Sequence, residues 1–279
     1  MKSTIRRRPR PTWTHAAALL IAAFVAAPLY WMFAGSVKSR TEIAADPPTP
    51  WPEDMTWENY EEAFGRYDFG TYMSNSVLVS VIATVMVLAL ATFAGYALAR
   101  LPVRGRTPIM VALLMISLFP TIALAAPLYL LMRETGMLNS HQGLIVVYVA
   151  LNVPFAIWIL RNYFLSVPQE MEEVAWMDGA SPVRTIVSVI LPQARPGVFT
   201  AGVFTFTACW TEFLIAVTLN SADAYRTIPV GMALFGDQYD VPYGTIFAAA
   251  TVSVLPIALL VLVFRKAVVS GLTSGAVKG

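Results

Sequence analysis

The sequence predicts an all-α membrane protein with six transmembrane helices, and three observations lead to that fold class. Apolar residues make up 57% of the 279 residues and charged residues only 13%, about half the ~25% of an ordinary soluble domain. Six stretches are apolar over the ~20 residues that a helix needs to cross a hydrocarbon core of ~30 Å. The 19 lysines and arginines are divided unevenly between alternate connecting segments. Lipid is therefore the expected solvent of this chain.

The predicted spans are helical because lipid offers no hydrogen-bond partner to an exposed backbone group. None has Lys, Arg or Asp in its middle, and one acid, Glu212, lies within the fifth. The first follows four arginines, but it is long for a signal peptide and has no A-x-A cleavage site, which predicts a retained signal anchor. The six spans occupy residues 15–35, 76–99, 109–132, 143–164, 197–219 and 245–264.

Prolines interrupt several of these spans, and each removes one backbone donor and frees a carbonyl. In lipid, the freed groups need partners from neighbouring helices, side chains or water in a cavity. Two interpretations stay open: tolerated kinks in a tight bundle, or a bundle that encloses a pathway and bends. The prolines concerned are Pro28, Pro120, Pro127, Pro154 and Pro256.

The basic residues predict the orientation of the chain. The amino terminus, residues 100–107, residues 161–196 and the carboxyl-terminal tail together hold fourteen of the 19, and the alternate loops hold five. By the positive-inside rule, both termini lie in the cytoplasm and the long acidic loop at residues 36–74 lies outside. We expect a multi-pass protein of a bacterial cytoplasmic membrane.

Several chemistries are excluded by missing motifs. No G-x-x-x-x-G-K-[ST] sequence occurs, so the chain has no P-loop and is not expected to hydrolyse ATP. The spans contain no HExxH, no GxSxG and no carboxylate pair, which argues against a membrane-embedded enzyme. Cys209 is the single cysteine and is expected to be a small core residue, while His15 and His141 are isolated and expected to be structural or solvated. No metal site is expected.

Residues 165–196, between the fourth and fifth spans, predict two short cytoplasmic helices joined by a turn. Pro168 suits the first turn of a helix, and the glutamates that follow favour its amino-terminal end. Gly179 tolerates the left-handed conformation that ends a helix, and Ser181 with Pro182 can begin the next one.

The first of these helices has an apolar face beside acidic residues. Helical spacing predicts one face with Val167, Met171, Val174 and Ala175, and another face with Glu172, Glu173 and Trp176. Such a helix is expected to dock in a groove on a soluble partner. A helix lying on lipid is the alternative, which its acidity beside anionic headgroups disfavours.

Here the sequence resembles a known family. Residues 173–180 (EVAWMDGA) and, after the next eight residues, residues 189–192 (VILP) resemble the EAA signature of ABC importer permeases, E-A-A, D-G-A and I-x-L-P. Val174 and Val189 depart from that pattern but stay apolar. Residues 210–214 (WTEFL) resemble a W-N-E-F-L stretch of the smaller, MalG-like permease subunit of maltose-type carbohydrate importers, with Thr211 in place of Asn. Further similar stretches are residues 94–100, 127–129, 154–158, 227–231 and 271–279.

The resemblance implies a type I ABC importer permease fold that forms half of a sugar pathway. Its implied partners are a second homologous permease, two ATPase subunits, an extracytoplasmic sugar-binding protein and membrane lipid, with no nucleic acid. ATP and Mg²⁺ would bind the ATPase subunits, and no cofactor is expected on this chain. The residues expected to couple to an ATPase are Glu170, Met171, Glu173, Val174, Ala175, Asp178, Gly179 and Ala180. An exposed ion pair contributes only ~0.2–1 kcal/mol and full switching of a gate needs ~5.5 kcal/mol, so shape fit should dominate coupling.

A second set of residues is expected near the substrate pathway. An acid inside a span usually faces the protein interior and has a function, although a structural hydrogen bond is the open alternative for Glu212. The candidates are Glu212, Trp210, Thr211, Asn152, Tyr148 and Thr121.

Two other functions compete with sugar import. A permease for glycerol-3-phosphate or another polyol is the nearer one, and the few outward basic residues favour a neutral sugar over it. A stand-alone secondary transporter would show inverted repeats or midspan charges, and the sequence shows neither.

Overall fold

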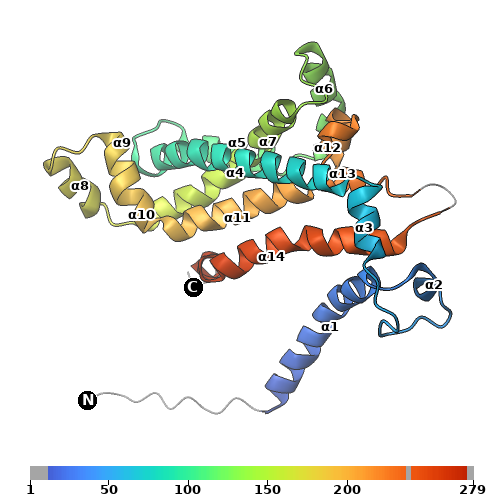
Figure 1. Ribbon diagram of the computed structural model, residues 1–279. Coiled ribbons are helices and arrows are strands. Elements are labelled where there is room, and N and C mark those ends of the chain that lie inside the picture. Colours follow the sequence, from blue (N-terminus) through green and yellow to red (C-terminus); the bar gives the residue numbers. More distant parts are fainter. Residues whose placement is uncertain (1–11, 237–239, 275–279) are drawn as a thin grey trace. The chain divides into compact units, whose positions relative to one another are not determined.

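The computed structural model describes residues 12–236 and 240–274, and all regular elements in these ranges are helical (Figure 1). Four described helices are long and apolar enough to cross a membrane, or up to six if each of two bent helix pairs is one span. The chain divides into two compact units, Met1–Tyr67 with Phe235–Val252 and Asp68–Leu234 with Ser253–Gly279. The basic residues at positions 2–10 and 278, which bear on orientation, lie outside the described residues, as does the end of the tail.

The first unit contains α1 (Thr12–Ser36), α2 (Arg40–Ile43), α3 (Glu58–Gly65) and the start of α14 (Tyr243–Ser274). Gly35 lets α1 approach α14, since a Cβ atom there would lie 2.5 Å from the Phe247 ring. Asn59 of α3 is buried and donates from Nδ2 to the carbonyls of Ser36 and Lys38, at 3.0 and 2.8 Å. These two bonds fix the chain where it leaves the first predicted span.

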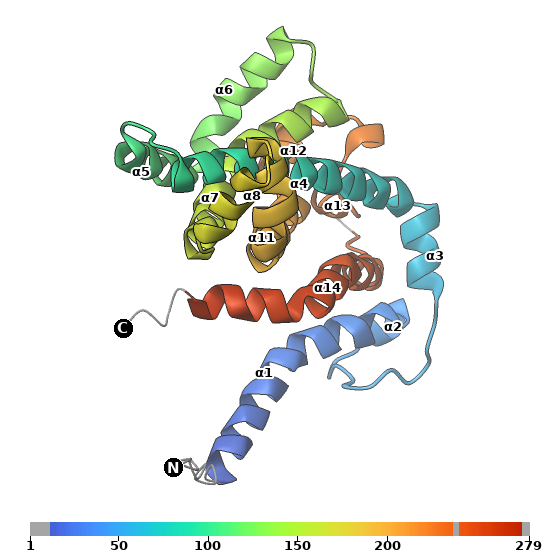
Figure 2. The same cartoon turned by 90° about the vertical axis from the view of Figure 1, so that its left-hand side faces the viewer.

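The second unit is built around three packed helices, α4 (Phe69–Arg100), α7 (His141–Ser166) and α11 (Arg195–Thr211), which Figure 2 shows side by side. A stripe at four-residue spacing on α4 is completely buried, as expected for a helix in the centre of a bundle. It consists of Val79, Ala83, Val87 and Ala91. Gly95 continues the stripe, because a Cβ atom there would lie 3.3 Å from the backbone nitrogen of Arg161 in α7.

Two of the predicted spans are divided. Residues 109–132 form α5 (Arg106–Ser117) and α6 (Thr121–Glu134), which meet at 89°. Pro120 stands at this bend, where its missing N–H prevents one helix from running into the next. Residues 197–219 fall on α11 and α12 (Leu214–Leu219), with an extended residue, Glu212, after the end of α11.

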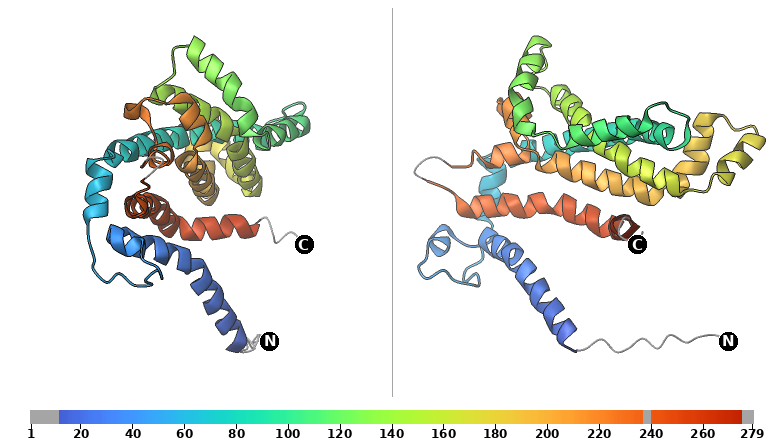
Figure 3. Two further views of the ribbon diagram at one scale, coloured as in Figure 1. Left: turned by 90° about the vertical axis from the view of Figure 1, so that its right-hand side faces the viewer. Right: turned by 180° about the vertical axis from the view of Figure 1, so that it is seen from behind.

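The connection between α7 and α11 contains the helix, turn and second helix that the sequence predicts (Figure 3). After α8 (Glu170–Met177), Gly179 has a φ of +78°, and the Ser181 hydroxyl accepts the Arg184 N–H ahead of α9 (Pro182–Thr185). A π-helical turn (Ile186–Ile190) and α10 (Leu191–Gln193) follow, and the chain bends by 84° into α11.

Candidate coupling and pathway sites

The buried and exposed side chains of α8 differ from those that helical periodicity predicts. Glu172, predicted on the same face as Glu173 and Trp176, is only 3% exposed and forms an ion pair with Arg100 at the end of α4, with 2.6 Å between Oε1 and Nε. The hydroxyl of Tyr96 donates to its other oxygen at 2.7 Å. Helical spacing alone did not predict this placement, because the partners come from a distant helix.

The predicted apolar face of α8 is also split between the protein interior and the surface. Val167 and Ala175 are buried and Met171 packs against the core of the second unit, so these three are occupied within the chain. Val174, in contrast, is 58% exposed. Of the other predicted coupling residues, Ala180 is half-buried, and the exposed ones are Glu170, Glu173, Asp178 and Gly179.

Large apolar side chains are nevertheless exposed along this segment. Met177, at the end of α8, is 87% exposed, and the others are Val174, Trp176, Val183 and Val187. A hollow of about 420 Å³ lies between α8 and the π-helical turn, lined by Glu170, Met171, Val174, Ala175, Asp178 and Val189. Of the exposed apolar side chains, Val174 lines the hollow, and exposed apolar side chains concentrated in one segment are typical of an interaction surface. We call this set of exposed side chains and the hollow the coupling surface.

Glu212 is hydrogen-bonded at the break in the predicted fifth span. Its Oε1 accepts the N–H of Ile215 at 2.8 Å, and its Oε2 accepts the N–H of Ala216 at 3.0 Å and the hydroxyl of Tyr148 at 2.9 Å. The first N–H groups of a helix have no partner inside it, and water does not replace one in lipid. Glu212 therefore caps α12 and joins it to α7.

The remaining pathway candidates fall into two places. Asn152 joins the Glu212–Tyr148 group, donating to the carbonyl of Tyr148 at 2.8 Å and lying 3.7 Å from Sγ of the buried Cys209. Trp210 is buried, and its indole donates to the Ser253 carbonyl of α14 at 3.2 Å.

Two candidates do not join that group. Thr211 is exposed and bonds the carbonyl of Thr207 on its own helix, at 2.9 Å. Thr121 is half-buried at the start of α6.

A polar network at the start of α7 was not predicted from the sequence. His141 Nε2 lies 2.8 Å from Oδ1 of Asn75, whose Nδ2 donates to the carbonyls of Ala224 and Arg226, both at 2.9 Å. The His141 ring packs edge-on against Tyr225, with 5.1 Å between centroids. This histidine is structural, and no group of three His, Cys, Asp or Glu side chains in the described ranges could hold a metal.

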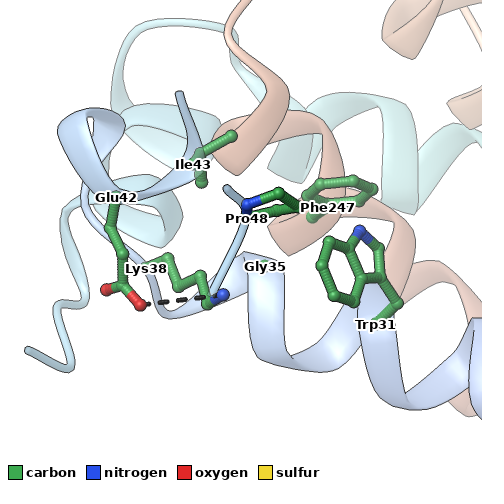
Figure 4. A pocket seen from close by; sticks show the side chains of 7 residues that line it. All are labelled: Trp31, Gly35, Lys38, Glu42, Ile43, Pro48 and Phe247. Carbon is green, nitrogen blue, oxygen red and sulfur yellow. Dashed lines mark ion pairs between the residues drawn. The ribbon is translucent and has the colours of Figure 1, made fainter. Parts of the chain in front are cut away.

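A pocket in the first unit surrounds Lys38, which is buried (Figure 4). Its ammonium group lies 3.6 Å from Glu42, donates to Oγ1 of Thr49 at 2.9 Å and lies 5.3 Å from the centre of the Trp31 ring. Burial opposes ionisation of Glu42, but bonds from Thr49 and the Glu53 N–H and the charge of Lys38 outweigh it and lower the pKa. The pocket is thus held together by its own charges.

A second carboxylate, Glu62 of α3, organises the same loop. It accepts hydrogen bonds from Arg40 at 2.8 Å, from Arg66 at 3.0 Å and from the hydroxyl of Thr245 at 2.7 Å. Burial alone would raise the pKa of Glu62, but these partners lower it overall. The side-chain bond and charge of Glu62 correspondingly raise the pKa of Arg40.

Comparison with known proteins gives concordant matches over most of the chain. Residues 88–274 match the family described as "Binding-protein-dependent transport system inner membrane component". The chain is 36% identical to the sulfoquinovosyl glycerol transport system permease protein SmoH of Agrobacterium fabrum, over 90% of this chain and 88% of that protein. It is 34% identical to the trehalose/maltose transport system permease protein MalG of Thermococcus litoralis, over 94% and 95% of the two chains. A crystal structure of a bacterial ABC transporter that imports alginate shares the fold, with a TM-score of 0.80 at 22% identity over 93% of this chain and 99% of that one.

Proposed function

Since the chain belongs to the family of binding-protein-dependent transport system inner membrane components, we propose that it forms half of the translocation pathway of an ATP-driven carbohydrate importer. As a member of that family it is a multi-pass permease of the inner membrane and a non-catalytic component of its transport system. The observation that carries the proposal is the coupling surface, because a chain without a P-loop needs an apolar contact with the subunit that consumes ATP.

The substrate class is supported by the relatives. One is named for sulfoquinovosyl glycerol and another for trehalose and maltose, which are all glycosides. The five basic residues of the loops assigned to the outside favour a neutral sugar over a polyol phosphate such as glycerol-3-phosphate. A carbohydrate is therefore the proposed cargo.

The proposed topology has six spans with both termini in the cytoplasm. The bent pair of α5 and α6 then counts as one span, α11 with α12 forms the fifth, and residues 182–193 of the other bent pair lie outside the bilayer. Non-helical backbone at membrane depth needs hydrogen-bond partners from the protein, and the Glu212 carboxylate supplies them to the N–H groups of Ile215 and Ala216. Residues 165–196 then project into the cytoplasm.

The proposed complex also contains a second homologous permease, two ATPase subunits that bind ATP and Mg²⁺, and an extracytoplasmic sugar-binding protein. The coupling surface docks in a groove of one ATPase. When ATP closes the ATPase dimer, α8 moves with it and the bundle opens outward. Hydrolysis restores the inward-facing state.

Reconstitution tests this function directly. The chain is co-purified in mild detergent with its partners, inserted into vesicles and supplied with ATP and the cognate binding protein. Uptake of labelled trehalose or maltose is compared with uptake of glycerol-3-phosphate. ATP-dependent accumulation of a sugar is expected. Accumulation of the phosphate alone would overturn the substrate class, and transport by the chain without partners would identify a secondary transporter.

Two substitutions test the coupling surface. Val174→Asp and Met177→Asp place a charge on exposed apolar positions, so they should weaken retention of the ATPase during purification without affecting insertion. Leu101→Asp is a matched control, since Leu101 is exposed just after α4 and outside residues 165–196. Equal ATPase retention in all three variants would contradict docking through this surface.

A further inference from the structure

A buried polar cluster ties α8 to the core of the second unit. The guanidinium of Arg100 and the carboxylate of Glu172 lie 2.6 Å apart, with side chains 6% and 3% exposed. Tyr96 donates its hydroxyl to the second carboxylate oxygen at 2.7 Å. Arg100 also donates from Nη2 to the carbonyl of Val167, between α7 and α8. The amino-terminal turn of α8 and the residue that leads into it are therefore held by one arginine.

The cluster stands where α4 and α7 are in close contact. Tyr96 and Arg100 are four residues apart on α4 and so lie on the same face. The Tyr96 ring is edge-on to Phe164 near the end of α7, with 6.2 Å between centroids. Gly95 brings the two backbones together beside it. A displacement of α8 is thus applied to a packed pair of helices and not to a loose loop.

A buried ion pair is a poor device for stability alone. Removing two charges from water offsets much of their attraction, and well-packed apolar residues of equal volume often stabilise a protein as well or better. The pair instead fixes the orientation of α8 relative to α4, because two charges with their hydrogen bonds allow one arrangement of the two helices. That property suits a joint that must transmit force.

We propose that Glu172, Arg100 and Tyr96 form a rigid joint that passes the displacement of α8 to α4, and that Glu172 is a positioning residue for energy coupling. The proposal rests on the proposed function, since it assumes that an ATPase subunit moves α8. The neighbouring carboxylates then have separate tasks. Glu173 is exposed on the surface of the segment, and Glu172 connects the segment to the spans.

The test uses three variants of the whole complex in vesicles: Glu172→Gln, Arg100→Gln and the double variant. Each single variant leaves a buried charge without its partner, so it can fail to assemble. The double variant removes both charges, so it leaves no buried charge without its partner, although glutamine is shorter than the arginine that it replaces at position 100. Arg104→Gln is the control, because Arg104 is an exposed arginine four residues further along. The readout is the ratio of ATPase activity with and without solute-loaded binding protein.

We expect the double variant to assemble with normal amounts of ATPase subunits while its stimulation ratio falls about fivefold or more, the lower end of couplings between distant sites. The control should keep the ratio of the unmodified complex. A double variant with normal stimulation would overturn the proposed joint and leave the proposed function standing. A double variant that fails to assemble would do the same, since the ion pair would then serve folding and not coupling. An unmodified complex without stimulation would overturn the proposed function and the joint with it.

Discussion

Replacing Glu212 with glutamine changes only one of two oxygens, yet three donors depend on them. Oε1 accepts one N–H, and Oε2 accepts both the N–H of Ala216 and the hydroxyl of Tyr148. The amide of glutamine keeps one oxygen and turns an NH₂ group toward donors at the other position. At best, two donors keep their acceptor and the N–H of Ile215 loses its own.

The magnitude follows from these contacts. A buried donor without a partner costs ~1–3 kcal/mol, and the two remaining bonds lose their charged acceptor, which weakens each by roughly 0.5–1 kcal/mol. We therefore expect Glu212→Gln to destabilise the protein by about 2–5 kcal/mol. Tyr148→Phe removes one donor from the carboxylate and should cost about 1.5–3 kcal/mol.

Thermal unfolding of the purified complex, followed by tryptophan fluorescence, measures this effect. Glu212→Gln should lower the midpoint by at least about 4 °C, on the scale of 2–4 °C per kcal/mol for chains of similar size. Glu134→Gln replaces an exposed acid at the end of α6 and should leave the midpoint unchanged. An unchanged midpoint for Glu212→Gln, together with an altered ATPase response to substrate, would refute the cap and favour a pathway role.

Three further outcomes are expected. Gly197→Ala should lower the thermal midpoint, because its Cβ atom would lie 2.3 Å from the Tyr163 ring and overpacking costs about 1–3 kcal/mol. Gly202→Ala is the control, since its Cβ atom would meet only a flexible side chain at 3.4 Å, and equal midpoints for the two variants would contradict this packing. Gly179→Ala should reduce uptake, since its φ of +78° costs a residue with a Cβ ~1–2 kcal/mol, and Gly179→Asn, which tolerates that φ better, should transport more than the alanine variant. The lowered pKa of Glu62 stabilises its loop above the unfolded value of 4.5, and this contribution is lost as pH falls through the folded value. Resistance of residues 36–67 to protease should therefore persist at pH 5 and decline below 4.5, and the decline should be smaller in Glu62→Gln, where the lowered pKa of Glu42 remains.

Hydropathy predicted long apolar helices because lipid makes a long apolar run and a helix nearly the same requirement. It did not predict that residues 197–219 divide, since no proline or glycine marks the break beside Phe213. The one signal there was the acid itself. Glu212 was recognised as unusual, but only the structure identifies the N–H groups of α12 as its partners.

Residues 165–196 show the same limit more sharply. Their helices and the turn at Gly179 follow from local rules, namely acids at a helix start, a left-handed glycine and a serine cap. Local rules do not predict which side chains of α8 are buried, because a carboxylate such as Glu172 is expected to face solvent unless its partner is known. Arg100 and Tyr96 belong to another helix, and no periodicity within residues 165–196 refers to them.

The π-helical turn at Ile186–Ile190 holds one residue more than the same stretch of α-helix would need. Deleting one residue there would restore α-helical winding and leave the segments on either side at nearly the same relative rotation, whereas a deletion inside an α-helix rotates everything before it by ~100°. These five positions are therefore the place in this segment where the loss of one codon would least disturb the direction of α8, and a deletion within α11 would disturb it far more.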